Sequence, residues 1–362
     1  MMTTRLAGAL AAAAAMVTLA ACSPSSQSGP TSTVSIDSSP AVSAVALPPA
    51  PEDPRPEVAW PLTGLDASKA SKAALSRPAL SIKIENTVEA RPQENLDKAD
   101  VVFEEYVEYG ISRLIAVYQS EYPESVGPIR SMRPMDRNIM GSFAGPLVFS
   151  GAQPRFIADT ANSGQVMVTE DLGDYGFYRS SDKAAPHNLH GYPTDFAAQS
   201  EGAKAPDQQW DIAYPASEAT ARESGKKAST IDITMSSMAH PQWRWHAASK
   251  TWKRYEAGTP HVTTDGTQLS ATNVVMLWVT VQYTSGSSTS SVPETLVAGR
   301  SGEGYVATGN SYIPITWSKK GQYDPFVLTT TKGDPVELAA GQTWFELIPN
   351  EGIYNATSIN IS

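Results

Sequence analysis

The chain has 362 residues and a formal charge of −10, because 37 acidic residues outnumber 27 basic ones. Apolar residues make up 41% of the chain, which excludes wholesale disorder, and the length corresponds to two or three domains. The acidic balance argues against nucleic acid as a partner. The presence of one cysteine excludes an intramolecular disulfide and any metal site built from several cysteines.

Residues 1–21 have the pattern of a secretory signal peptide. Arg5 supplies a positive charge, an uncharged run follows from residue 6 to residue 19, and small residues precede Cys22. The run is too short for a stable membrane span, which needs about 20 apolar residues. The segment Leu19-Ala20-Ala21-Cys22 resembles a bacterial lipobox. The resemblance implies cleavage before Cys22, a diacylglyceryl thioether on its sulfur and palmitate among the acyl chains.

Lipidation predicts where the protein resides. The lipid on Cys22 would attach the chain to the cytoplasmic membrane, facing the extracytoplasmic side, and two acyl chains give lasting attachment. The alternative is a buried cysteine, which the Ala-rich run and the Ser/Pro-rich tail around Cys22 disfavour. A lipidated sulfur cannot act as a nucleophile, so cysteine-dependent catalysis is excluded.

Residues 22–58 are predicted to form a disordered tether. The segment is rich in Ser, Pro and Ala, and five prolines between residues 48 and 56 favour extended polyproline conformation. Such a composition buries too little apolar surface to offset the chain entropy of folding. We expect the tether to hold the folded part away from the bilayer.

Residues 59–225 are predicted to form a mixed α/β domain. Alternating or continuous apolar patterns predict strands at 79–84, 101–107, 113–119 and 147–150. Helices are expected at 134–143, where proline is tolerated in the first turn, and at 197–204.

A hairpin is expected between the second and third of these strands. A two-residue loop at Tyr109-Gly110 would place Tyr106 opposite Arg113. Alternation along the strand would then put Glu104 and Glu108 on the same face as Arg113.

Residues 226–352 are predicted to form a smaller β-rich domain, built as a barrel or sandwich. Short strands separated by frequent turns are typical of such folds. The expected strands are 230–234, 243–246, 252–255, 273–283, 304–308, 313–317 and 343–348. Residues 285–291 are expected to be a polar loop, and residues 353–362 a tail. The fold class expected for the whole chain is α+β.

Four aromatic residues flank a predicted turn in this second region, namely Trp243, Trp245, Trp252 and Tyr255. Cross-strand aromatic pairs stabilise sheets, so core packing is the main interpretation. An exposed set could instead stack on sugars.

Several short motifs occur in a fixed order along both regions. They include Glu108-Tyr109-Gly110-Ile111-Ser112-Arg113, Val126-Gly127-Pro128-Ile129-Arg130-Ser131-Met132-Arg133, Ala185-Pro186-His187-Asn188, Pro314-Ile315-Thr316-Trp317 and Gly341-Gln342-Thr343-Trp344. With these motifs, residues 60–350 resemble the YerB-like lipoproteins, a bacterial family of two domains of unknown function. The resemblance implies a lipoprotein with two domains and supplies no reaction. Tyr109 and His190 depart from the family pattern, which has glycine and an aromatic residue there.

Basic residues of the first region form a candidate anion site. The candidate residues are Arg91, Arg113, Arg130, Ser131 and Arg133. Guanidinium groups bind phosphate or carboxylate bidentately, and the predicted helix start at residue 134 would add unpaired N–H groups. A phosphate or uronate group would fit there. The alternative is a structural ion-pair network in which these arginines neutralise nearby glutamates.

Candidate acid and base residues lie in the same region. Glu104 and Glu108 are two steps apart on the predicted strand face, so they could transfer protons or hold a divalent cation. His187 lies in a Pro-His-Asn loop, where it could transfer protons or cap a turn, and Asn188 would be its polar support. His187 and His190 have a spacing that suits two metal ligands, but a third ligand is not evident. No metal site and no cofactor is therefore predicted.

Two classes of function follow from these features. The leading hypothesis is a non-enzymatic binding or scaffold lipoprotein that engages an envelope glycopolymer or an envelope protein. The alternative is a cell-envelope enzyme that holds a phosphorylated or acidic glycan with its arginines and uses Glu104 or His187 as acid or base.

Overall fold

One large sheet runs through both predicted regions of the chain. The structure, a computed structural model, describes residues 54–287, 290–350 and 357–362. In spatial order the central path of the sheet is β19 (Val327–Thr330), β18 (Ser311–Lys319), β17 (Arg300–Thr308), β15 (Asn273–Ser287), β21 (Thr343–Pro349), β2 (Val101–Tyr106), β3 (Ser112–Tyr118), β1 (Leu80–Glu85), β4 (Leu147–Phe149) and β5 (Met167–Thr169). Two further strands pair at its sides, β16 (Ser290–Leu296) with β15 and β9 (Lys226–Lys227) with β18.

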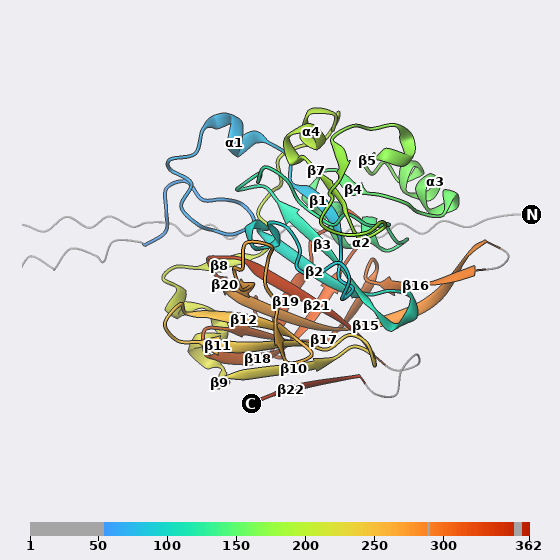
Figure 1. The fold of residues 1–362 in the computed structure, drawn as a ribbon. Coiled ribbons are helices and arrows are strands. Elements are labelled where there is room, and N and C mark those ends of the chain that lie inside the picture. The colour runs from blue at the N-terminus through green and yellow to red at the C-terminus, as the bar shows by residue number, and fades with distance from the viewer. Residues whose placement is uncertain (1–53, 288–289, 351–356) are drawn as a thin grey trace, which may run out of the picture. The chain divides into compact units, whose positions relative to one another are not determined.

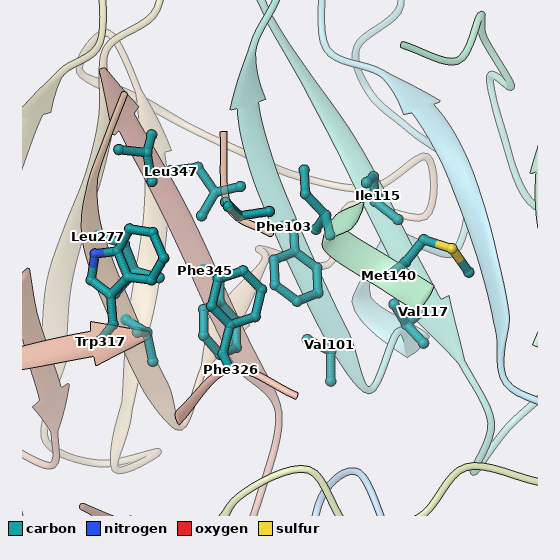
Figure 2. Packing of buried hydrophobic residues seen from close by; sticks show 14 of the residues in the cluster. Val101, Phe103, Ile115, Val117, Met140, Leu277, Trp317, Phe326, Phe345 and Leu347 are labelled. Atoms are coloured by element: carbon teal, nitrogen blue, oxygen red, sulfur yellow. The ribbon is translucent and has the colours of Figure 1, made fainter. Parts of the chain in front are cut away.

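The junction between the two regions is a parallel pair of strands. β2 lies beside β21 (Figure 1). In this pairing Phe103 is opposite Phe345. The two rings stack with centroids 4.7 Å apart, and Figure 2 shows them within one apolar cluster. The C-terminal strands therefore continue the sheet that the N-terminal strands begin, and one core crosses the predicted boundary between the regions.

A second sheet covers one face of the large sheet. Its order is β13 (Thr259–Pro260), β12 (Thr251–Glu256), β11 (Pro241–His246), β10 (Thr230–Thr234) and β22 (Ser358–Ile361), with β14 (Ser270–Ala271) beside β12. Trp243 and Trp252 are fully buried between the sheets, which confirms core packing for these two rings. β22 lies within residues 353–362, which the sequence predicted to be a tail, and it pairs with β10.

Helices are short and few beside the strands. They are α1 (Lys72–Ser76), α2 (Asp136–Met140), α3 (Pro154–Asn162), α4 (Pro193–Ala198) and α5 (Thr220–Ser224). In the described part of the chain five 3₁₀ turns accompany them, η1 (Leu96–Lys98), η2 (Glu108–Gly110), η3 (Gly141–Phe143), η4 (Glu170–Leu172) and η5 (Ala216–Glu218). The remaining strands form two small pairs, β8 (Asp211–Ala213) with β20 (Glu337–Ala339) and β6 (Phe177–Arg179) with β7 (Leu189–Gly191). The chain is thus sheet-rich, more so than the expected mixed α/β first domain.

The eleven predicted strands are confirmed within four residues at each end. The helix expected at 134–143 is confirmed within two residues, as α2 followed directly by η3. Two local predictions are wrong. The helix expected at 197–204 lies earlier, because Pro193 begins α4 and the chain leaves helical geometry after Ala198. The predicted polar loop 285–291 contains the ends of β15 and β16, since backbone pairing does not require apolar side chains.

The hairpin register also differs from the prediction. The connection contains η2, with both Tyr109 (φ +64°) and Gly110 (φ +77°) in the left-handed region. Tyr106 therefore pairs with Ser112, and Glu105 lies opposite Arg113. A shift of one residue sends each side chain to the other face of the sheet.

Candidate functional site

Three arginines meet near the ends of β1 and β2 and the start of β3. Antiparallel pairing sets Glu85, the last residue of β1, opposite Arg113 of β3. The segment after β3 returns along β1, where the backbone N–H of Arg130 donates to the Lys83 carbonyl at 2.9 Å. Arg133 follows three residues later. We call Arg113, Arg130 and Arg133 the arginine cluster.

Two members of the arginine cluster share one backbone carbonyl. Nη1 of Arg113 donates to the Ser131 carbonyl at 3.0 Å, and Nη1 of Arg133 approaches the same oxygen at 3.3 Å. Arg133 also binds Oε2 of Glu108 through Nε and Nη2, each at 2.7 Å. Nε of Arg130 lies 3.3 Å from Oε1 of Glu85. The cluster thus brings Ser131 and Glu108 together with the arginines, and its Arg133–Glu108 ion pair is of the kind that the structural alternative expects.

The arginine cluster carries more positive charge than its carboxylates balance. Glu85 and Glu108 face three guanidinium groups. Arg113 is 5% exposed, and its buried Nε has no hydrogen-bond partner among the described residues. Burial, followed by the positive charges of Arg133 and Arg130, lowers the pKa of Arg113 to about 10. Arg113 still carries its charge at neutral pH, so a positive potential is concentrated at this place in an acidic protein.

His187 joins the arginine cluster through Glu85. Its Nδ1 lies 3.0 Å from the same Glu85 oxygen that Arg130 contacts. The other carboxylate oxygen of Glu85 is buried without a hydrogen-bond partner in the described part of the chain. Glu85 is therefore a buried anchor that orients both Arg130 and His187, and sequence reasoning missed it.

A cavity of about 320 Å³ adjoins the arginine cluster. It is lined by Glu108, Ser131, Met132, Arg133, Ala152, Gln153, Phe156 and Val292. Gly151, at φ +87°, packs closely against Ser131: a Cβ at this position would lie 2.7 Å from the serine Oγ. The lining of the cavity combines polar side chains of the cluster with apolar side chains.

Two predicted site residues lie away from the arginine cluster. Arg91 donates from Nε and Nη2 to the Asn86 carbonyl, and it lines a separate cavity of about 180 Å³ with Glu256 and His261. Asn188 donates to the Ser180 carbonyl and accepts from Arg179, so it braces its own loop and not the His187 ring.

Glu104 lies on the opposite face of the sheet from the arginine cluster. It is fully buried and forms an ion pair with Arg254 of β12, which also binds Glu346 and Glu256. Glu104 and Glu108 thus do not form the predicted acid–base pair, because β2 ends at Tyr106 and Glu108 lies in the turn η2, outside the alternation of the strand.

The predicted contribution from a helix end is also wrong. α2 has five residues, and the backbone N–H of Arg133 is already bound by Oδ2 of Asp136 at 2.9 Å. The N–H groups that precede this helix therefore stabilise the loop itself. The arginine side chains, and not the helix, supply the positive potential.

A buried triad beneath the arginine cluster was missed by sequence reasoning. Nζ of Lys83 forms ion pairs with Glu105 and with Asp136, and all three side chains are fully buried. Burial, followed by the negative charge of Asp136, raises the pKa of Glu105 to about 8. The only indication of this triad in the sequence is Lys83, which interrupts the apolar residues of β1.

The raised pKa of Glu105 predicts a pH-dependent stability. Between its unfolded value of 4.5 and about 8, the folded protein binds a proton that the unfolded chain releases. The free energy of unfolding should therefore fall as pH rises from 5 to 9, and Glu105→Gln should reduce this fall by about 4 kcal/mol. Urea titrations of both proteins across that range measure it. Identical slopes for the two proteins would contradict the assignment.

His187 and His190, whose spacing in the sequence suits two metal ligands, contact different carboxylates. His187 lies against Glu85, and Nδ1 of His190 lies 2.6 Å from Glu94. Among the residues that the structure describes, no group of three or more His, Cys, Asp or Glu side chains is arranged to hold a metal ion.

Comparison with known proteins identifies the family. Residues 62–206 match the N-terminal domain of a protein of unknown function (DUF3048), and residues 231–345 match its C-terminal domain. The chain belongs to the DUF3048 family. This confirms the resemblance to the YerB-like lipoproteins.

One relative and one solved structure agree with the DUF3048 assignment. "Putative lipoprotein YerB" of Bacillus subtilis (strain 168) is 33% identical over 131 residues, which are 36% of this chain and 39% of the relative. The match therefore spans less than half of that protein. The crystal structure of YerB protein from Bacillus subtilis has a TM-score of 0.71 at 21% identity, covering 84% of this chain and all of that one. This likeness shows the fold.

A lipoprotein role is suggested by the name of the relative. Cys22 and residues 22–53 of the predicted tether lie outside the described residues, whereas its last five residues, 54–58, are described, and the Val58 carbonyl accepts a hydrogen bond from the N–H of Ala67. No described helix has both the length and the apolar character that crossing a membrane requires.

Proposed function

We propose that this protein is a lipid-anchored envelope lipoprotein whose arginine cluster binds an anionic group of an envelope glycopolymer. The signal-peptide pattern and Cys22 support an anchor in the cytoplasmic membrane with the folded part on the extracytoplasmic side. The name of the YerB relative is consistent with that anchor.

The observation that carries the proposal is the charge imbalance of the arginine cluster. The three guanidinium groups of the cluster are paired with two carboxylates, and Arg113, which contacts the Ser131 carbonyl, has no carboxylate partner of its own. An extra buried positive charge is unfavourable in a purely structural network. A bound anion would balance that charge.

The ligand chemistry follows from the donors. Guanidinium groups bind phosphate or carboxylate through paired charge-assisted hydrogen bonds. Phosphodiester and uronate units are therefore the two groups that suit the site. An envelope protein that presents the same group is the other partner consistent with the arginine cluster.

The enzymatic alternative loses one of its candidate residues. Glu104 is committed to Arg254 on the other face of the sheet, which leaves Glu108 and His187 beside the arginine cluster. Both are already paired with residues of that cluster or with Glu85. Binding is therefore the function that we propose.

Replacement of two arginines should weaken anion binding. We expect Arg130→Gln/Arg133→Gln to lower the affinity of the full-length protein in detergent for soluble poly(glycerol phosphate) and polygalacturonate at least tenfold. The double variant loses the charge-assisted interaction of Arg130 with the anion, worth about 1.5–3 kcal/mol, and the positive charge of Arg133 beside it. Isothermal titration calorimetry at two salt concentrations measures the change.

Two further variants distinguish binding from structure. Glu108→Gln removes a competing carboxylate, so it should tighten binding of poly(glycerol phosphate), whereas Arg300→Gln, at an exposed position of β17, should change nothing. A loss of stability in the double variant without any change in affinity, or weaker binding of poly(glycerol phosphate) in Glu108→Gln, would show that the arginines form only a structural network.

A further inference from the structure

The cavity beside the arginine cluster differs from the cluster in charge. Within it, Arg133 and Glu108 are bound to each other, so their charges cancel. Most N–H groups of Arg133 are committed to Glu108 and to the backbone carbonyls of Ser131 and Met132. The uncompensated charge lies instead on Arg113, whose Nη1 contacts the same Ser131 carbonyl.

The walls of the cavity suit a molecule with hydroxyl groups on an apolar ring. Glu108 keeps 22% of its side chain exposed, so its carboxylate can accept hydrogen bonds. The lining also includes the apolar side chains of Met132, Phe156 and Val292. A polar acceptor together with apolar side chains suits the hydroxyl groups and the C–H groups of a pyranose.

We propose that this cavity holds a neutral sugar residue that carries the anionic group bound by Arg113 and Arg130. This inference rests on the proposed function and narrows its ligand to a sugar phosphate or a sugar bearing a carboxylate, as opposed to an acyclic polyol phosphate. The cavity volume of about 320 Å³ accommodates one hexose. The shared Ser131 loop places the neutral and the cationic parts next to each other.

The test compares four small probes on the full-length protein in detergent. The probes are inorganic phosphate, glycerol 3-phosphate, glucose 1-phosphate and hexyl phosphate, each titrated by calorimetry. We expect glucose 1-phosphate to bind at least tenfold more tightly than inorganic phosphate or glycerol 3-phosphate. An equal gain with hexyl phosphate would assign the cavity to an apolar tail and overturn the proposal.

Matched variants test whether the tighter binding of glucose 1-phosphate depends on the cavity. Ala152→Leu puts bulk into the cavity and should abolish the preference for glucose 1-phosphate, while the affinity for inorganic phosphate stays unchanged. Ala161→Leu, at an exposed position of α3, should behave as the parent. Glu108→Gln should reduce the ratio of the two affinities even if Ala152→Leu folds poorly.

The outcomes separate the two proposals. The sugar site is wrong, and the anion site remains, if phosphate binds through the arginines but glucose 1-phosphate binds no more tightly than phosphate. The same conclusion follows if both Ala152→Leu and Glu108→Gln keep the preference for glucose 1-phosphate. If none of the four probes binds, the proposed function itself fails together with the sugar site.

Discussion

Replacing Arg254 with leucine should lower the free energy of unfolding by about 3–5 kcal/mol. Arg254 is fully buried and binds Glu104, Glu346 and Glu256, with Glu346 at 2.9 Å and Glu256 at 3.1 Å. Without the guanidinium, buried carboxylates would face each other with no counter-charge. Urea unfolding followed by tryptophan fluorescence suits the measurement, because the Arg254 guanidinium lies over the rings of Trp243 and Trp344.

The cause of this loss can be tested by a second substitution. Burial, followed by the negative charge of Glu104, raises the pKa of Glu346 well above its usual value. Glu104→Gln in the Arg254→Leu background should therefore recover part of the stability, because it removes a charge that the missing arginine balanced. Arg244→Leu, at an exposed position of the neighbouring strand, should cost less than about 1 kcal/mol. Equal losses in Arg244→Leu and Arg254→Leu would contradict the buried network.

Replacing Lys83 with methionine should have a second large effect, of about 3 kcal/mol or more. The ammonium group is the positive member of the buried triad with Glu105 and Asp136. Its removal leaves two carboxyl groups in contact, so Lys83→Met/Glu105→Gln should be more stable than Lys83→Met alone. Lys332→Met, at an exposed position, is the matched control.

Lys83→Met should also change the structure of the arginine cluster. Asp136 binds Lys83 through Oδ1 and the backbone N–H of Arg133 through Oδ2. Loss of Lys83 should therefore loosen the Ser131–Arg133 loop and weaken phosphate binding, even in protein that remains folded. Unchanged affinity for poly(glycerol phosphate) in folded Lys83→Met would show that the triad stabilises the sheet without positioning the cluster.

Local patterns predicted much of the fold because they depend on neighbouring residues. The apolar alternation of residues 79–84 and the apolar run at 147–150 became β1 and β4, and seven strands of the second region formed where expected. The motif from Arg130 to Arg133 likewise predicted the arginine cluster, since these residues are adjacent in the chain. Arg113 joined them through the pairing of β1 with β3.

The sequence by itself determined the composition of the elements, the family and the candidate arginines. Tertiary structure alone decided which face of the sheet each charge occupies. The left-handed turn at Tyr109 and Gly110 shifted the register by one residue, and this shift set Glu105 opposite Arg113. The parallel pairing of β2 with β21 then placed Glu346 beside Glu104, with Arg254 against both. Such pairings join residues up to 242 positions apart, so no local pattern of side chains encodes them.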